Sequence, residues 1–369
     1  MVSVTDNSMK KHLILVGGGH AHVFILQQLQ HQRWQDTRIT LISPDEHQYY
    51  SGMFSGYMEG KYGLDEIRID LKQLCEKAGV DFIDDSVQGI DHEKQEVFLS
   101  SGERIHYDFI SFNIGSRSAG ESIPGLRELG ALIKPNFKVP LIRETLVDKE
   151  HIVVVGGGAS GIEISLSLKA NRNQLNRNTL VSLIHSDQLL GTYGARVNKL
   201  VTRLVQQKGI QLIRDLVISV EDKYLITKSG VRISFDGLLW LTGPSAPRIF
   251  RDSGLRTDDQ GYLLVNDYLQ SISRSNIFGA GDCIGMKSHP NLHKTGVYAV
   301  REAPILWINL KRHLEGRALK KYRPQSGYLS ILSTGNEEAL LLYRGLALHG
   351  GWCWKLKRRI DTSFIKRYR

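Results

Sequence analysis

Two related stretches decide the fold of this chain: His-Leu-Ile-Leu-Val-Gly-Gly-Gly over 12–19 and His-Ile-Val-Val-Val-Gly-Gly-Gly-Ala-Ser-Gly over 151–161. Each is a short apolar run that ends in a glycine-rich turn and is followed by a stretch of helical character. Small residues in such a turn let the backbone approach a pyrophosphate, which then sits on the positive end of the following helix. The duplication predicts that the chain binds two dinucleotides.

A third motif, Ile-Phe-Gly-Ala-Gly-Asp over 277–282, completes the set. A short apolar strand that ends in Gly-Asp is typical of the end of an FAD domain, where the carboxylate holds the ribityl and pyrophosphate linkage. Three ordered motifs are a stronger signal than one glycine turn, for which a structural loop is the alternative. We therefore expect FAD to be bound by Gly17, Gly18, Gly19, Gly281 and Asp282.

The first fingerprint departs from the usual pattern at two positions. His22 stands where a third glycine normally lets the helix pack against the strand. Ser43 stands at the end of the second strand, where a ribose-binding acid is usual. A serine hydroxyl can still bond one ribose hydroxyl, but it lacks the charge-assisted bonds of a carboxylate. We expect FAD affinity to depend more on the pyrophosphate and flavin ends.

The second fingerprint is complete, because Gly156, Gly158 and Gly161 have the expected spacing. His185 occupies its ribose-acid position. Without an acid there is no repulsion of a 2′-phosphate, so the sequence permits NADPH and does not favour NADH. A vestigial nucleotide site is the alternative interpretation.

Length and alternation of elements predict an α/β protein with two Rossmann-like domains. A chain of 369 residues with 41% hydrophobic content exceeds the usual size of a single core. The Gly-Asp motif follows the second fingerprint, which predicts that the second domain is inserted in the first, with Gly115 and Gly243 at the crossing points. We expect an FAD domain over 10–118 and 242–312, an NAD(P)H domain over 119–241, and a C-terminal subdomain over 313–369 with a β-hairpin and an amphipathic helix.

The cysteines and histidines indicate neither a redox pair nor a metal. Cys75, Cys283 and Cys353 form no CxxC pair, which favours a reducing, cytoplasmic location. The pairs His20 with His22 and His289 with His293 lack further ligands at a recognisable spacing, so no metal site is predicted.

The C-terminal stretch is strongly basic. Residues 351–369 carry seven of the lysines and arginines and one aspartate, within a chain of net charge +10. Apolar side chains recur there at every fourth residue: Trp352, Leu356, Ile360, Phe364 and Tyr368. As a helix this stretch would suit an anionic membrane interface, which predicts peripheral attachment to the inner face of the membrane through Trp352 to Arg369. Packing on the protein's own body or in a homodimer is the alternative, and we expect no nucleic-acid partner.

With these motifs in place, the chain resembles two-dinucleotide-binding-domain flavoproteins of the pyridine nucleotide-disulfide oxidoreductase superfamily, such as type II NADH:quinone dehydrogenases. It more closely resembles the flavoprotein module found fused to selenide, water dikinase. The resemblance is carried by residues 17–22, Tyr-Ser-Gly-Met over 50–53, residues 294–301 and residues 360–364. It implies non-covalent FAD, NAD(P)H as reductant, and commonly a membrane quinone as acceptor.

The resemblance also implies roles for individual residues. Glu163 corresponds to a glutamate near the nicotinamide and flavin, although a first-turn carboxylate stabilised by the helix dipole is an equal alternative. Lys294 should begin the long helix that points toward the pyrimidine end of the flavin, where a cation would raise the flavin potential; the alternative is a solvated lysine. The loop with Tyr50, Gly52 and Met53 should border the flavin or a quinone channel, unless it packs as an ordinary loop.

The predicted function is transfer of two electrons from NAD(P)H through FAD to a quinone-type acceptor. Hydride transfer needs no nucleophile, which agrees with a sequence that shows no Ser-His-Asp or Cys-His arrangement. Two alternatives stay open. One is a soluble flavin oxidoreductase with another donor, or with a protein or selenium-containing acceptor. The other is a non-catalytic FAD-binding interaction protein.

Overall fold

The computed structural model describes residues 10–369, and the chain divides into two compact units. Unit 1 comprises Met1–Gln48, Asp70–Ser116 and Ala246–Pro324. Unit 2 comprises Tyr49–Ile69, Arg117–Ser245 and Gln325–Arg369. These bounds differ from the predicted domains, because residues 49–69 and the C-terminal residues 325–369 both belong to unit 2.

The core of unit 1 is a parallel five-stranded sheet with the order β21-β9-β1-β2-β5. Its strands are β1 (Lys11–Val16), β2 (Thr37–Ser43), β5 (Asp81–Asp84), β9 (Phe109–Phe112) and β21 (Ile277–Gly279). The apolar run of β1 is typical of a strand covered on both faces, and Leu13, Ile14 and Leu15 are fully buried. The strand order reverses between β1 and β9, where doubly wound sheets bind ligands.

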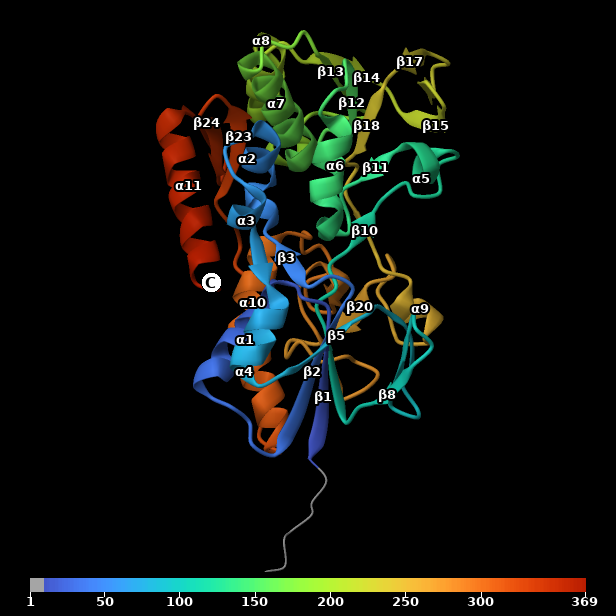
Figure 1. The fold of residues 1–369 in the computed structure, drawn as a ribbon, viewed down its shortest axis with the longest axis vertical. Helices are drawn as coiled ribbons and strands as arrows, with labels where there is room; N and C mark the ends of the chain where they lie inside the picture. The colour runs from blue at the N-terminus through green and yellow to red at the C-terminus, as the bar shows by residue number, and fades with distance from the viewer. Residues whose placement is uncertain (1–9) are drawn as a thin grey trace, which may run out of the picture. The chain divides into compact units, whose positions relative to one another are not determined.

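Three helices of unit 1 lie together beside this sheet (Figure 1). They are α1 (His20–His31), α4 (Leu71–Ala78) and α10 (Gly296–Leu314). The remaining elements of the unit are β6 (Val87–Asp91), β7 (Glu96–Leu99), β8 (Arg104–His106), α9 (Ile249–Asp252), β20 (Leu263–Val265) and β22 (Ile284–Met286).

Unit 2 repeats the scheme with a parallel sheet of order β11-β18-β12-β13-β14. Its strands are β11 (Ala131–Leu132), β12 (His151–Val155), β13 (Leu180–His185), β14 (Gln211–Arg214) and β18 (Gly237–Trp240). The helices are α5 (Leu126–Leu129), α6 (Val139–Leu146), α7 (Ala159–Gln174) and α8 (Ala195–Gln207). This part also contains a small three-stranded sheet, formed by β15 (Val217–Glu221), β16 (Tyr224–Thr227) and β17 (Arg232–Ser234). It ends with a pair of short strands, β10 (Arg117–Ser118) and β19 (Pro244–Ser245).

The C-terminal residues of unit 2 form an antiparallel sheet and a helix. The predicted hairpin consists of β23 (Ser330–Gly335) and β24 (Glu338–Tyr343), and the structure adds a third strand, β25 (Leu346–Gly350). The helix α11 (Gly351–Lys366) follows and packs on β24 (Figure 1). Strand β23 contacts α7 and α2 (Phe54–Glu59). The C-terminal sheet therefore packs on α7, the helix that follows the second glycine turn in the same unit.

The predicted fold class is confirmed: the chain is α/β with two Rossmann-like sheets. Two local expectations were wrong. The segment with Tyr50, Gly52 and Met53, expected to be a loop, forms a short 3-10 helix (Ser51–Met53) between the short strand β3 (His47–Tyr49) and α2. The elements α3 (Leu64–Ile67) and β4 (Arg68–Asp70) follow. The long helix begins at Gly296 rather than Lys294, because the Thr295 hydroxyl accepts a hydrogen bond from the Val297 N–H and caps the helix.

Candidate functional site

The first glycine turn, at the end of β1, has no room for side chains. Gly17 has φ +87°, and its N–H donates to the Ile42 carbonyl at 2.8 Å. A Cβ on Gly17 would lie 2.8 Å from the Asn113 carbonyl oxygen, and one on Gly19 would lie 2.3 Å from Asn113 Oδ1. On Gly18 it would lie 2.3 Å from a methyl carbon of Leu71. The packing of this turn therefore requires glycine at positions 17 and 19, where a Cβ would meet the Asn113 backbone, whereas at Gly18 the Leu71 side chain would have to shift.

Asn113, which the sequence analysis did not single out, holds the first turn together. Its Oδ1 accepts from the Ala21 N–H at 2.9 Å, at the start of α1. Its Nδ2 donates to the Ala280 carbonyl at 2.6 Å. One buried side chain thus joins the glycine turn to the Gly-Asp motif. The only sequence signal was its place at a strand end, directly before Ile114 and Gly115.

His22 fills the position of the missing third glycine. The ring is fully buried, with Nδ1 2.7 Å from the Gly17 carbonyl oxygen and Nε2 2.9 Å from Ser111 Oγ. Because a carbonyl only accepts, Nδ1 donates and Nε2 accepts from the serine hydroxyl. Burial lowers the pKa of His22 to about 4, so the ring is neutral at physiological pH. The histidine replaces close glycine packing with two internal hydrogen bonds.

Ser43 lies at the end of β2 as predicted, but its hydroxyl is already engaged. The Oγ donates to the Asp45 carbonyl at 3.0 Å, and the side chain is buried. Asp45 Oδ1 in turn accepts from the His47 N–H at 2.8 Å. The Ser43 oxygen is left to act as an acceptor only, so a ribose hydroxyl would have to be the donor.

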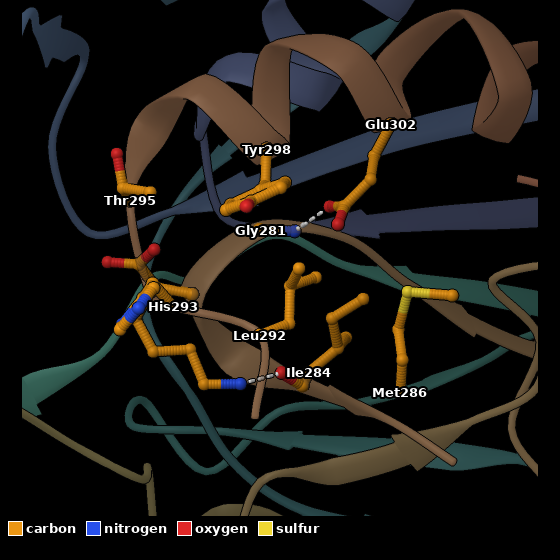
Figure 2. Close-up of a pocket in the computed structure, with 10 residues that line it drawn as sticks. Gly281, Ile284, Met286, Leu292, His293, Thr295, Tyr298 and Glu302 are labelled. Atoms are coloured by element: carbon orange, nitrogen blue, oxygen red, sulfur yellow. Dashed lines mark hydrogen bonds between the residues drawn. The ribbon is translucent and has the colours of Figure 1, made fainter. Parts of the chain in front are cut away.

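A pocket of unit 1 is lined by the Gly-Asp motif and by α10 (Figure 2). Gly281 has φ +77°, and its N–H donates to Glu302 Oε2 at 2.6 Å. Asp282 lines the same pocket and accepts from Ser116 Oγ at 3.4 Å. Glu302 is 1% exposed, and burial raises its pKa to about 7. The sequence analysis did not predict Glu302 as a site residue. The signal that could have found it is an acidic residue on the apolar face of the long helix.

Lys294 lies in the same pocket, two residues before α10. Its ammonium donates to the Ile284 carbonyl and lies 4.0 Å from the centre of the Tyr262 ring. Burial lowers the pKa of the Lys294 amine, although nearby Asp258 and Asp282 oppose this shift. The lysine is therefore partly exposed and engaged by its neighbours rather than fully solvated. A partly buried cation sits beside the predicted FAD-binding aspartate.

The second glycine turn, after β12, is a tight cradle. Gly156 has φ +136°, and a Cβ there would lie 2.2 Å from the Leu241 carbonyl oxygen. A Cβ on Gly161 would lie 1.8 Å from the Gly156 oxygen, whereas one on Gly158 would meet nothing within 4 Å. The first and third glycines serve close packing of turn and helix, and Gly158 leaves the space over the start of α7 open. This is the arrangement that a pyrophosphate requires.

His185 is the last residue of β13, at the expected ribose position. Its Nδ1 donates to the Asp187 carbonyl at 2.6 Å, which fixes the ring beside the turn. On the neighbouring strand β14, Arg214 is its register partner. The strand ends therefore present a histidine and an arginine rather than an acid.

Gly115 and Gly243 lie where the chain passes from one unit to the other. They have φ +69° and +106°, and a Cβ on either would meet nothing within 4 Å. The conformation, rather than crowding, favours glycine at both positions. Each glycine is followed in the sequence by one strand of a pair in unit 2: β10 comes after Gly115, and β19 comes after Gly243.

Glu163, on the first turns of α7, takes part in a polar cluster of unit 2. Its Oε1 accepts from Ser55 Oγ at 2.8 Å and from the Ser333 N–H at 2.8 Å. The Lys357 ammonium lies 3.6 Å from the same oxygen. Neither sequence interpretation anticipated these bonds, which tie α7 to α2 and β23.

The loop 50–53 contacts the C-terminal helix of unit 2. The Tyr50 ring stacks on Phe364 with 4.4 Å between centroids, and its hydroxyl donates to Asp361 Oδ1 at 3.1 Å. A Cβ on Gly52 would lie 2.7 Å from the Tyr50 ring, so glycine lets the ring lie flat there. Met53 is 1% exposed and packs in the interior.

The predicted apolar stripe of α11 is divided between the interior and the surface. Phe364 and Tyr368 are buried, whereas Trp352 is 54% and Ile360 44% exposed. Exposed cations accompany the two exposed apolar side chains: Lys355, Arg359, Lys366 and Arg367. The expectation of one continuous membrane-facing stripe was therefore wrong at its C-terminal end.

The described residues 10–369 contain neither a membrane-spanning helix nor a group of metal ligands. No helix there is both long and apolar enough to cross a membrane. No three His, Cys, Asp or Glu side chains there come together as metal ligands would.

A parallel sheet with a glycine cradle after its central strand, present twice, defines a two-dinucleotide oxidoreductase fold. Residues 11–302 match the family described as pyridine nucleotide-disulphide oxidoreductase. The chain therefore belongs to this family, and its cofactors are FAD and NAD(P)H. The two cradles, in which a Cβ on Gly17, Gly19, Gly156 or Gly161 would clash, fit these nucleotides.

Relatives extend over nearly the whole chain. The NADH dehydrogenase-like protein YutJ of Bacillus subtilis is 23% identical, with 89% of this chain and 91% of that protein covered. The demethylphylloquinone reductase NdbB of Synechocystis is 22% identical, with 92% and 89% covered. The solved sulfide:quinone oxidoreductase of Aquifex aeolicus shares the fold, with a TM-score of 0.79, 21% identity, and 97% and 91% covered. The chain is thus an NAD(P)H-type oxidoreductase by family.

Proposed function

We propose that this protein is an NAD(P)H dehydrogenase that passes two electrons through FAD to a quinone. The observation that carries the proposal is the pair of glycine cradles, one in each unit. When bound, FAD supplies a ring system that accepts a hydride and passes its electrons on. The protein's own residues bind and orient the two nucleotides and set the charge around them.

In this proposal, unit 1 holds FAD through the glycines of the first turn, Gly281 and Asp282. The N–H groups of the turn and the start of α1 meet the pyrophosphate. Lys294, partly buried in the same pocket, favours negative charge on the flavin and so raises its potential. Ser43 accepts a bond from a ribose hydroxyl.

Unit 2 holds the nicotinamide nucleotide through Gly156, Gly158 and Gly161 in this proposal. His185 and Arg214, at the ends of neighbouring strands, bind the 2′-phosphate of NADPH. NADPH is then a substrate alongside NADH. Glu163 orients the nicotinamide amide, and the loop with Tyr50, Gly52 and Met53 serves the flavin and the acceptor.

The quinone acceptor is supported by the names of relatives, which include a demethylphylloquinone reductase and a sulfide:quinone oxidoreductase. Sulfide chemistry on this fold would need a reactive cysteine pair. The three cysteines are free and buried, and burial raises the pKa of the Cys75 and Cys283 thiols to about 12. Such thiols are poor nucleophiles, so we favour NAD(P)H as donor. The closer resemblance to the module fused to selenide, water dikinase stays a prediction.

We also propose that α11 attaches the protein peripherally to an anionic membrane at the cytoplasmic face. Its exposed side carries Trp352 and Ile360 among exposed cations. Indole and aliphatic groups at a lipid interface, flanked by lysine and arginine, are attracted both by apolar burial and by charge.

The test is anaerobic mixing of the purified yellow protein with NADH and, separately, with NADPH. Rapid bleaching of the flavin absorbance, followed by recovery on addition of a short-chain quinone, is the expected result. Bleaching by NADPH at a rate similar to NADH would support the role of His185. If neither nucleotide bleaches the flavin, the proposal is wrong, and another donor or a binding role has to be sought.

A further inference from the structure

Unit 1 contains a buried carboxyl group that the proposed function does not use. Glu302 lies on α10 and lines the pocket of Gly281 and Asp282, where we place FAD. Its side chain points from the helix to the Gly281 turn (Figure 2), is 1% exposed, and accepts from the Gly281 N–H through Oε2 at 2.6 Å. Glu302 is therefore in direct contact with the turn that the flavin nucleotide is expected to meet.

The hydrogen bond to Gly281 does not require an acid. The amide oxygen of a glutamine would accept the same bond, and an amide costs less to bury than an ionisable carboxyl group. A buried titratable group in a pocket is a candidate for function. An acid at position 302 therefore indicates a role besides holding the turn.

Acids outnumber cations around Glu302. Asp282 lines the same pocket, and both carboxylates are near one ammonium, that of Lys294. Lys294 is also near Asp258, so its charge is shared among three acids. The other titratable groups around Glu302 and Asp282 are neutral near pH 7: His20, Cys283, Tyr298 and Tyr322. The pocket has no spare positive charge for a second anion.

The protonation of Glu302 is sensitive to further charge in the pocket. Burial raises its pKa to about 7, Asp282 adds to this shift, and the Gly281 N–H and Lys294 oppose it. Near neutral pH the carboxyl group is thus divided between its two protonation states. A new negative charge beside it raises the pKa further, because like charges disfavour the carboxylate.

We propose that Glu302 is a positioning residue that takes up a proton from solvent when the flavin is reduced and releases it when the flavin is reoxidised. The inference rests on that part of the proposed function which places FAD in this pocket. A hydride brings two electrons and one proton, and it leaves the reduced flavin with one negative charge. The balance is NAD(P)H + FAD + Glu302–COO⁻ + H⁺ → NAD(P)⁺ + FADH⁻ + Glu302–COOH. The proton on Glu302 offsets the added charge.

This coupling makes the flavin potential depend on pH in a defined way. Below about pH 7 Glu302 is protonated in both redox states and adds no proton to the reduction. Between about pH 7 and the higher pKa of the reduced protein it adds one. Above that pKa it is ionised in both states, and its negative charge lowers the potential. A glutamine in its place carries no charge at any pH.

The test is a spectroelectrochemical titration of the holoenzyme with redox mediators, which requires neither NAD(P)H nor quinone. For a two-electron couple, each proton taken up lowers the midpoint potential by about 30 mV per pH unit, the value of a tenfold change in the equilibrium constant. We expect two protons per two electrons in the wild type just above pH 7, and one in Glu302→Gln. The potentials should coincide at about pH 6, and the wild type should have the lower potential at about pH 9. Protonation of the flavin itself is common to both proteins and cancels in the comparison.

The matched control is Glu315→Gln, which removes an exposed carboxylate from the end of the same helix. It should take up two protons, as the wild type does. A merely structural role of Glu302 would give a constant difference in potential at every pH.

Infrared difference spectra of the reduced and oxidised holoenzyme give a second readout. At about pH 8 the wild type should gain the band of a protonated carboxyl group on reduction, and Glu302→Gln should lack it. Glu302→Asp keeps an acid and should show the band at a shifted frequency. This variant assigns the band to position 302 even if Glu302→Gln retains too little FAD to be titrated.

The outcomes separate this inference from the proposed function. A constant difference between wild type and Glu302→Gln, or uptake of one proton by the wild type just above pH 7, would overturn the coupling and leave the proposed function intact. A second proton that depends on Glu302, in a protein whose flavin neither NADH nor NADPH bleaches, would support the coupling and overturn the proposed donor. A purified protein that neither contains nor takes up FAD would overturn both.

Discussion

Individual buried polar residues decide how unit 1 shapes its predicted FAD site. Asn113 bonds both the start of α1 and the Ala280 carbonyl, and Glu302 receives the N–H of Gly281. His22 replaces glycine packing by two internal hydrogen bonds. These side chains hold a backbone conformation that glycine alone permits but does not enforce.

Glu302 gives a pH-dependent prediction. Burial raises its pKa from about 4.5 to about 7, so the folded protein keeps a proton that the unfolded chain loses first. The free energy of unfolding should therefore fall as pH rises from about 4.5 to about 7, by on the order of 3 kcal/mol from this group. Glu302→Gln, whose amide oxygen still accepts from Gly281, should flatten that part of the curve in denaturant titrations.

The matched control is Glu315→Gln at the exposed end of α10, which should leave the pH dependence as in the wild type. Parallel curves for the wild type and Glu302→Gln would contradict the assignment.

At the scale of elements, α11 has two different faces. One holds the Lys357–Asp361 pair and the buried rings, and the other carries exposed cations around Trp352 and Ile360. The recurrence of apolar residues at every fourth position could not distinguish these faces, because a helix that packs on its own protein has the same period as one on a membrane.

The exposed face predicts binding to anionic vesicles. Each cation near such a surface contributes about 1 kcal/mol, so Lys355→Gln and Arg359→Gln should each weaken vesicle binding by roughly fivefold in sedimentation assays. The double variant Lys199→Gln/Arg203→Gln on α8, which removes two exposed cations from another helix, should bind as the wild type does. Equal losses from both helices would indicate a general effect of net charge.

At the scale of the whole molecule, the chain carries the same scheme twice. In each unit a buried central strand, β1 or β12, runs into a glycine turn and a helix, with parallel neighbours on both sides. Each starting histidine, His12 or His151, bonds a hydroxyl on the next strand, Thr40 or Ser182. The repeat supports one nucleotide for each unit.

Hydrogen exchange measured by mass spectrometry tests that assignment. Adding FAD to the apoprotein should slow exchange in peptides that contain 17–22 and 279–283, because bound ligand stabilises the state that holds it. A nicotinamide nucleotide should slow exchange around 156–163. Peptides from β6–β8 and β15–β17 serve as internal controls. Protection of the same turn by both nucleotides would refute one site for each unit.

The fold class, the approximate elements and the two glycine turns could be predicted from the sequence, because they depend on local spacing. The signals for an apolar strand, a glycine turn and the start of a helix lie within about a dozen residues of the sequence. Two copies of this pattern, followed by Gly281 and Asp282, indicate the family to which the chain belongs. The sequence predicted these glycines as cradles for two pyrophosphates, and the structure adds that a Cβ on Gly17, Gly19, Gly156 or Gly161 would clash.

Which side chains meet could not be predicted from the sequence, because it depends on how each unit packs. Tyr50 and Asp361 are 311 residues apart, and Asn113 and Ala280 are 167 apart, yet both pairs are hydrogen-bonded. The packing also buries two of the five residues of the apolar stripe, Phe364 and Tyr368, and leaves Lys294 only partly exposed. The physical reason is that burial and pairing of polar groups depend on the whole packed unit, whereas periodicity and turn chemistry depend on neighbours along the chain.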